Sequence, residues 1–273
     1  MNRPDILQSW SLRGRCAAIV VGMMLVGATA CGSSDPTTTA TTASSTTASA
    51  PGEAIVNPGD GGDYRPQLDP ANFVEGIDNP YLPLTPGSRW VYAGDSKGEP
   101  EDIVVVVTDQ TRVIEGITAV VVRDTVHVGG LLVEDTFDWF AQDREGNVWY
   151  LGEDSSEIGP DGEVLNNDGS WEYGKNGALP GIVMPGIPRV GDAFRQEYRR
   201  GIAEDMAEVL RIEPAHSIGL GDYADVVVTE DWTPLEPDVV ENKWYAPGIG
   251  KIYGTHESGP PGTIELIEFT PGS

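Results

Sequence analysis

The sequence is poor in the residues that most often carry enzyme chemistry, since its 273 residues include two cysteines and three histidines. Cys16 and Cys31 both fall in or directly after the predicted leader, so the remaining chain has no thiol for a disulfide, a metal site or a nucleophile. His127, His216 and His256 are scattered, and no His-x-x-x-His pair indicates zinc. We therefore predict no catalytic residue, no metal and no cofactor.

Basic residues are also scarce, with 17 Lys and Arg against 43 Asp and Glu and a formal net charge of −26. A chain this acidic is a poor ligand for nucleic acid or anionic lipid, because both bind through basic patches. The acidic excess favours solubility outside the cell, and it allows a cation-binding role without requiring one.

The first thirty residues have the pattern of a secretory signal peptide. Arg3, Arg13 and Arg15 precede the apolar run 17–26, which is too short to span a bilayer. The small residues that follow end in Ala28-Thr29-Ala30-Cys31, which resembles the lipobox of bacterial lipoproteins, where the cysteine thiol receives a diacylglyceryl group. We predict that Cys31 is lipidated, with simple cleavage and secretion as the alternative.

Residues 31–63 are predicted to be the lipidated cysteine followed by a disordered tether. This stretch is rich in Thr, Ser and Ala and has no hydrophobic periodicity, so it cannot bury enough surface to fold. Two acyl chains hold a protein stably on a membrane, at about 0.8 kcal/mol per buried CH₂. The alternative to a tether is that residues 31–63 are a leader segment without a role. Residues 64–273 then form a single β domain.

The pattern of the rest of the chain predicts an all-β fold. Short runs of β-branched and aromatic residues, about a dozen in all, alternate with Gly, Asn, Asp and Pro. Strands this short and this closely spaced favour an antiparallel meander that closes or curls into a barrel or half-barrel, with a β-sandwich as the alternative.

One hairpin raises a specific question about two acids. Residues 117–128 and 131–141 are joined by Gly129-Gly130, a pair suited to the tight turns of β-hairpins. A two-residue turn without irregularity places Asp124 opposite Asp135 on an otherwise apolar face. Two carboxylates so placed cannot both ionise cheaply without a partner.

Four arrangements would accommodate this pair, which we treat as a candidate ligand- or cation-binding site. An arginine from a neighbouring strand could satisfy both acids, with Arg89, Arg195 and Arg211 as candidates. The pair could instead lie at a polar barrel mouth or in a hydrogen-bonded cluster. It could bind a cation or a cationic ligand. It could also act as the acid dyad of a glycoside hydrolase.

The segment 178–188 is apolar but contains three prolines, which argues against a regular strand or helix. Either it packs over one end of the barrel as a plug, or it forms an exposed apolar lip that touches a ligand or partner. The candidate lip residues are Leu179, Ile182, Val183 and Met184.

Six stretches of the chain are distinctive: NPYLPLTPGSRWVY at 79–92, EDTFDW at 134–139, NVWYLGE at 147–153, QEY at 196–198, EDWTPLEP at 230–237 and WYAPGIG at 244–250. Together they resemble an uncharacterised family of exported, actinobacterial-type β-sheet lipoproteins. The resemblance implies export and a β architecture, and it implies no particular activity.

Together these features predict a lipid-anchored, extracytoplasmic binding or interaction module of the cell envelope, held to the membrane by its lipid and directed at an unidentified envelope ligand or protein. A carrier of an apolar molecule, with 178–188 as its lid, is one alternative, and a hydrolase is another. An unfilled apolar interior would favour the carrier, an acid pair in an open cleft would favour the enzyme, and a filled barrel would favour the interaction module.

Overall fold

The protein is an all-β domain, seen in a computed structural model that describes residues 64–96, 98–259 and 262–273. The predicted signal peptide, Cys31 and tether lie outside the described residues. Within those ranges no helix has both the length and the apolar character needed to cross a bilayer. The elements are η1 (Pro70–Asn72), β1 (Arg89–Ser96), β2 (Glu99–Ile114), β3 (Ile117–Val128), β4 (Leu131–Gln142), β5 (Val148–Ile158), β6 (Val164–Asn166), β7 (Trp171–Glu172), β8 (Leu179–Met184), β9 (Ala193–Arg195), β10 (Glu197–Tyr198), β11 (Met206–Ile218), β12 (Gly221–Trp232), β13 (Val240–Ala246), β14 (Gly250–Ser258) and β15 (Gly262–Thr270).

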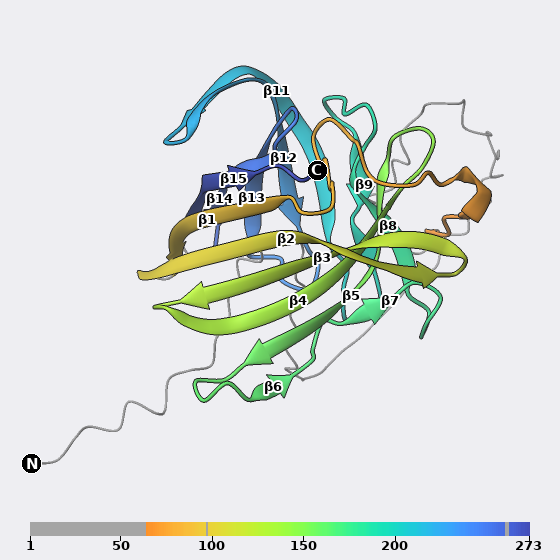
Figure 1. Ribbon diagram of the computed structural model, residues 1–273, viewed down its shortest axis with the longest axis horizontal. Helices are drawn as coiled ribbons and strands as arrows, with labels where there is room; N and C mark the ends of the chain where they lie inside the picture. Colours follow the sequence, from red (N-terminus) through yellow and green to blue (C-terminus); the bar gives the residue numbers. More distant parts are fainter. Residues whose placement is uncertain (1–63, 97, 260–261) are drawn as a thin grey trace, which may run out of the picture.

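The strands form one antiparallel sheet that nearly closes into a barrel, as predicted. Its order is β10-β8-β5-β4-β3-β2-β1-β15-β14-β13-β12-β11-β9, with β6 and β7 paired to β5 (Figure 1). The two ends of this order, β9 and β10, are consecutive in the chain and are separated only by Gln196. The short segment 193–198 therefore pairs with β11 through β9 and with β8 through β10. In this way it brings the two edges of the sheet together.

Alternation of side chains along the strands builds the interior. On β2, Ile103, Val105 and Val107 are each 1% exposed, while the residues between them are half-buried. These three side chains pack with aromatic side chains such as Trp90 and Phe140 in one continuous apolar core. Burial of one strand face is the period-2 pattern expected of a barrel wall.

The predicted turn of the β3–β4 hairpin is confirmed, but the predicted register is wrong. Gly129 and Gly130 have φ angles of 58° and 81°, the left-handed region that this turn requires. Beyond the turn, His127 pairs with Leu132 and the next pair is Val126 with Glu134, so Val133 is an extra, bulged residue. A one-residue shift moves every following side chain to the other face of the sheet.

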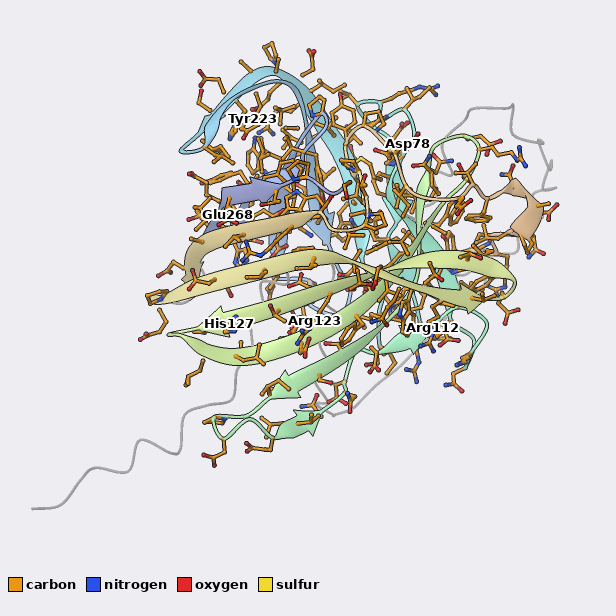
Figure 2. All side chains as sticks on the ribbon, in the orientation of Figure 1. Asp78, Arg112, Arg123, His127, Tyr223 and Glu268 are labelled. Carbon is orange, nitrogen blue, oxygen red and sulfur yellow. The ribbon has the colours of Figure 1, made fainter. Side chains whose placement is uncertain are left out.

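The bulge separates the two acids that were expected to meet. Asp124 pairs with Thr136 and is 6% exposed, whereas Asp135 pairs with Thr125. The carboxylate of Asp135 accepts two 2.8 Å hydrogen bonds from Arg123 on the outer surface (Figure 2). The predicted opposition of Asp124 and Asp135 is therefore wrong.

The prediction that residues 178–188 form neither strand nor helix is also wrong, because Leu179–Met184 form β8. Ile182, Val183 and Met184 are at most 5% exposed, so these candidate lip residues are part of the core. Pro180 is tolerated near the start of the strand, where it lies opposite Glu197 of the short strand β10, and the other two prolines follow the strand's end.

Candidate functional site

The inner face of the barrel carries charged side chains beside its apolar core. On β4 the buried residues Glu134, Thr136 and Asp138 alternate with half-buried Asp135 and Phe137, so every second residue turns inward. The charged side chains buried in this way, each at most 8% exposed, include Glu101, Asp124, Glu134, Asp138, Glu153, Arg195, Glu197, Asp231, Lys243 and Lys251.

An opposed pair of acids does exist, one strand further along than predicted. Asp138 of β4 lies directly opposite Glu153 of β5. The hydroxyl of Tyr150 donates to Oδ1 of Asp138 at 2.6 Å and lies 3.1 Å from Oε2 of Glu153. The hydroxyl of Tyr150 has a single proton, so it can donate to only one of the two carboxyl groups at a time.

A third acid joins this pair through a tryptophan. The indole N–H of Trp171 donates to Oε2 of Glu197 at 2.6 Å, and the Trp171 ring meets that of Tyr150 edge to face at 5.2 Å. We call Asp138, Tyr150, Glu153, Trp171 and Glu197 the acid cluster. Each of its three acids has one oxygen with no hydrogen-bond partner among the described residues.

Burial raises the pKa of all three acids of the acid cluster. Burial raises the pKa of Asp138 to about 7, although the hydrogen bond from Tyr150 opposes the shift. Burial also raises the pKa of Glu153 well above its usual range, and Glu197 and Asp138 add to that effect. The pKa of Glu197 is raised by burial and by Asp205. In its protonated form each of these groups can donate a hydrogen bond as well as accept one.

The opposite wall of the barrel holds an ion-pair network. The ammonium group of Lys243 lies 2.9 Å from Asp231 and 3.5 Å from Glu241. Glu241 is also 2.9 Å from Nε2 of His256. Burial alone would lower the pKa of Lys243, but Asp231 and Glu241 outweigh it and raise the pKa. These charges satisfy one another and position the strands β12, β13 and β14.

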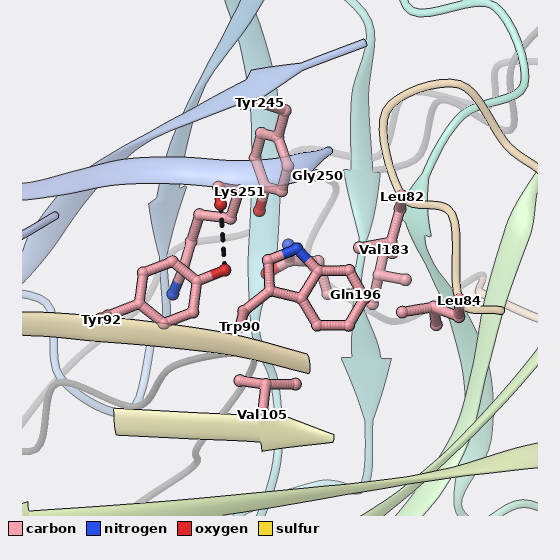
Figure 3. A pocket seen from close by; sticks show the side chains of 10 residues that line it. All are labelled: Leu82, Leu84, Trp90, Tyr92, Val105, Val183, Gln196, Tyr245, Gly250 and Lys251. Atoms are coloured by element: carbon pink, nitrogen blue, oxygen red, sulfur yellow. Dashed lines mark hydrogen bonds between the residues drawn. The ribbon is translucent and has the colours of Figure 1, made fainter. Parts of the chain in front are cut away.

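Lys251 is also buried in the barrel, beside a small pocket of about 30 Å³ (Figure 3). Trp90, Tyr92 and Tyr245 line this cavity, and the hydroxyl of Tyr92 donates to the backbone oxygen of Lys251 at 2.9 Å. Burial, with Lys243 nearby, lowers the pKa of Lys251 to about 8. The cavity has the volume of one water molecule, so it does not accommodate a ligand.

An open cleft of about 230 Å³ lies beside the acid cluster, and two residues of that cluster, Glu153 and Trp171, are among those that line it. Arg112 stacks 4.0 Å from the centre of the Trp139 ring and pairs with Glu172 at 2.5 Å (Figure 2). The cleft is lined by Trp139, Glu153, Asp154, Ser170, Trp171, Glu172, Lys175, Asn176 and Arg199.

The structure therefore separates the residues singled out from sequence. Asp124 faces the interior, while Asp135 lies outside with Arg123. Two of the three arginines proposed as partners bind other acids, since Arg89 pairs with Glu268 and Arg211 with Glu213. Among the described residues, no group of three or more potential ligands is arranged to hold a metal ion.

Sequence reasoning missed the acid cluster. Its residues are spread over β4, β5, β7 and β10, and no spacing along the chain connects them. The available signal was the acid–aromatic composition of EDTFDW and NVWYLGE, two stretches that meet at the pair Asp138–Glu153 of β4 and β5.

The comparisons with known proteins show no family. No family model matches the chain, and no curated protein matches it, so the resemblance to a lipoprotein family stays a prediction. Two solved structures are distantly similar. One, from Bacteroides fragilis, is provisionally described as an exported protein with a YmcC-like fold; it has a TM-score of 0.42 and 16% identity over 70% of this chain and 99% of its own. The other, from Parabacteroides distasonis, is provisionally described as a lipoprotein; it has a TM-score of 0.33 and 14% identity over 72% of this chain and all of its own. Likenesses this distant carry no conclusion about function.

Proposed function

We propose that the protein is a lipid-anchored binding module on the extracytoplasmic face of the cell membrane. The observation that carries the binding role is the open cleft of about 230 Å³, which is lined by polar and charged residues together with Trp139 and Trp171. A concave surface with a few convergent polar groups is the usual form of a small-ligand site. The anchoring role rests on the sequence around Cys31.

The packing of the interior favours this role over a carrier of apolar molecules. The space around Trp90 and Lys251 is limited to about 30 Å³, and the space around Lys243 and His256 to about 20 Å³. A wall of buried carboxyl and ammonium groups is also a poor environment for an apolar ligand, because such a ligand would leave them unsatisfied. A filled barrel is the outcome that sequence reasoning associated with an interaction module.

Hydrolysis is supported less well than binding. Asp138 is 1% exposed and bonded to Tyr150, so of the opposed acids only Glu153 meets the cleft. The spacing Gly94-x-Ser96-x-Gly98 occurs in the chain, but Ser96 ends β1 and pairs with Glu99 of β2 in a hairpin. A nucleophilic serine in this motif instead needs a sharp turn from a strand into a helix.

The anchor is tested by metabolic labelling with an alkyne fatty acid, followed by membrane fractionation. Wild type should be labelled and should sediment with the membrane, because two acyl chains hold a protein there. The change Cys31→Ala should abolish the label. Cys16→Ala is the matched control and should remain labelled, since it lies within the predicted signal peptide. Labelling of Cys31→Ala at the wild-type level would refute the anchor.

A further inference from the structure

The place where the two edges of the sheet meet is contacted by a residue from far away in the sequence. Tyr64, the first residue that the structure describes, is 3% exposed. Its hydroxyl donates to the backbone oxygen of Pro180 in β8 at 2.6 Å. A buried tyrosine combines a large apolar contact with one directed hydrogen bond, so it can hold a backbone segment in one position.

The ring of Tyr64 contacts the other side of the same seam. It meets the ring of Tyr198 in β10 edge to face, with the ring centres 6.1 Å apart. The guanidinium group of Arg195 in β9 lies 5.8 Å from the centre of the Tyr64 ring and 4.7 Å from that of the Tyr198 ring. Both distances are within the range of cation–π interactions. One side chain therefore contacts β8, β9 and β10, the strands through which the barrel closes.

The neighbours of Tyr198 hold two residues of the cleft. Glu197 accepts a hydrogen bond from the indole N–H of Trp171 at 2.6 Å, and Arg199 donates to the backbone oxygen of Ser170 at 2.7 Å. Ser170, Trp171 and Arg199 all line the cleft. Side chains alternate along an extended segment, so Glu197 and Arg199 lie on one face of it and Tyr198 on the other. The segment is thus held at the seam from one face, and with its other face it supports the wall of the cleft.

The hydrogen bond to Trp171 matters because the strand that carries Trp171 is short. β7 has two residues and pairs with β5, which positions the backbone of Trp171 but leaves the direction of its side chain to other contacts. The hydrogen bond to Glu197 is one such contact, and the edge-to-face packing on Tyr150 is another. A displacement of β10 would therefore release the indole ring and change the shape of the cleft.

We propose that Tyr64 is a positioning residue of the cleft, which holds β10 where Glu197 and Arg199 support the cleft wall. This inference rests on the proposed function, because it assigns control over the same binding site. Tyr64 directly follows residues 31–63, the predicted tether. A displacement of the chain at this end of the domain is therefore transmitted to the cleft through β10.

The test is solvent exchange of the Trp171 indole N–H, measured by NMR on the full chain in a neutral detergent. Tyr64→Phe removes the hydroxyl that bonds Pro180 and keeps the ring. Exchange at Trp171 and at the amides of β10 should become about tenfold faster, because loss of one buried hydrogen bond makes local opening about that much more frequent. Tyr64→Ala also removes the ring contacts and should accelerate this exchange further, by roughly a hundredfold.

Tyr81→Phe is the matched control, because it removes a similar bond of the same N-terminal segment, 3.1 Å long, to the backbone oxygen of Asp225 in β12. It should leave exchange at Trp171 as in wild type. The amide of Val122 in β3 reports destabilisation of the whole domain and should be unchanged in Tyr64→Phe. Unchanged exchange at Trp171 in Tyr64→Phe, equal acceleration at Val122, or an equal effect of Tyr81→Phe would each overturn the proposal. Neither a ligand nor the lipid anchor enters the measurement, so its failure is distinguishable from failure of the proposed function.

Discussion

At the scale of single residues, the main feature is carboxyl groups held in a non-aqueous interior. Burial raises the pKa of Asp138 from 3.8 to about 7 and that of Glu101 from 4.5 to about 7. Between the two values the folded state binds a proton that the unfolded state has released. The free energy of unfolding therefore falls as the pH rises through this interval.

We expect the domain to be more stable at pH 5 than at pH 8. Each such acid contributes a slope of roughly 1.4 kcal/mol per pH unit inside its window. Acids whose pKa is lowered, such as Glu172 and Glu213, act in the opposite direction only below about their ordinary value of 4.5. Lys251, with its pKa of about 8, increases stability with pH only above that value.

Urea unfolding of wild type and Asp138→Asn between pH 5 and pH 8 measures this effect. The variant keeps an oxygen for Tyr150 and should lose part of the pH dependence. Asp102→Asn, at an exposed position on β2, should behave as wild type. A wild-type domain that gains stability from pH 5 to pH 8 would contradict the expectation.

At the scale of elements, the β3–β4 hairpin is governed by one bulged residue. Val133 is the residue without a partner on β3, and it shifts Asp135 to the outer face and Glu134 and Asp138 to the inner face. If Val133 were paired regularly instead of bulged, the part of β4 that follows it would turn its opposite face toward the interior. The bulge is thus what places the acid cluster inside the barrel.

Deletion of Val133 should leave the fold intact, because the pairs His127–Leu132 and Val126–Glu134 then become consecutive. The expected loss is about 1–2 kcal/mol for one partly buried valine. Deletion of Thr136, within the regular part of β4, should instead prevent folding, since it turns one flank of the strand inside out. Thermal unfolding followed by circular dichroism compares the two, and equal stability would show that the bulge does not set the faces.

At the scale of the whole molecule, the barrel closes through the short segment of β9 and β10. Gly181 of β8 lies against this segment, and a Cβ atom there would overlap the carbonyl group of Gln196. Closure therefore depends on a residue with no side chain where two backbones approach.

Gly181→Ala should push β10 away from β8 and lower the free energy of unfolding by about 3 kcal/mol or more. Hydrogen exchange should increase in β8 and β10 before the rest of the sheet. Gly254→Ala is the matched control, because a Cβ atom there would make contacts of 3.7 Å and 3.9 Å only. Equal stability of the two variants would show that this contact does not hold the barrel closed.

Much of the architecture follows from local patterns in the sequence. Alternating β-branched residues predict the strands, and Gly129-Gly130 predicts the hairpin turn, because the geometry of each depends on a few neighbouring residues. The acidic composition and the scarcity of thiols and histidines likewise constrain function without reference to the fold.

Tertiary structure alone decides which acids lie together inside the barrel. Asp124, Asp135 and Asp138 look alike in sequence. The face of the sheet on which each lies depends on the bulge at Val133, and a valine at this position gives no sequence signal for a bulge. The prolines around β8 argue against a strand locally, yet pairing of Gly181 and Ile182 with β5 stabilises one. Glu153 lies beside Trp171 because β5 pairs with β7, and Glu197 reaches the same Trp171 from β10, which pairs with β8 next to β5. No local rule encodes contacts between residues so far apart in the chain.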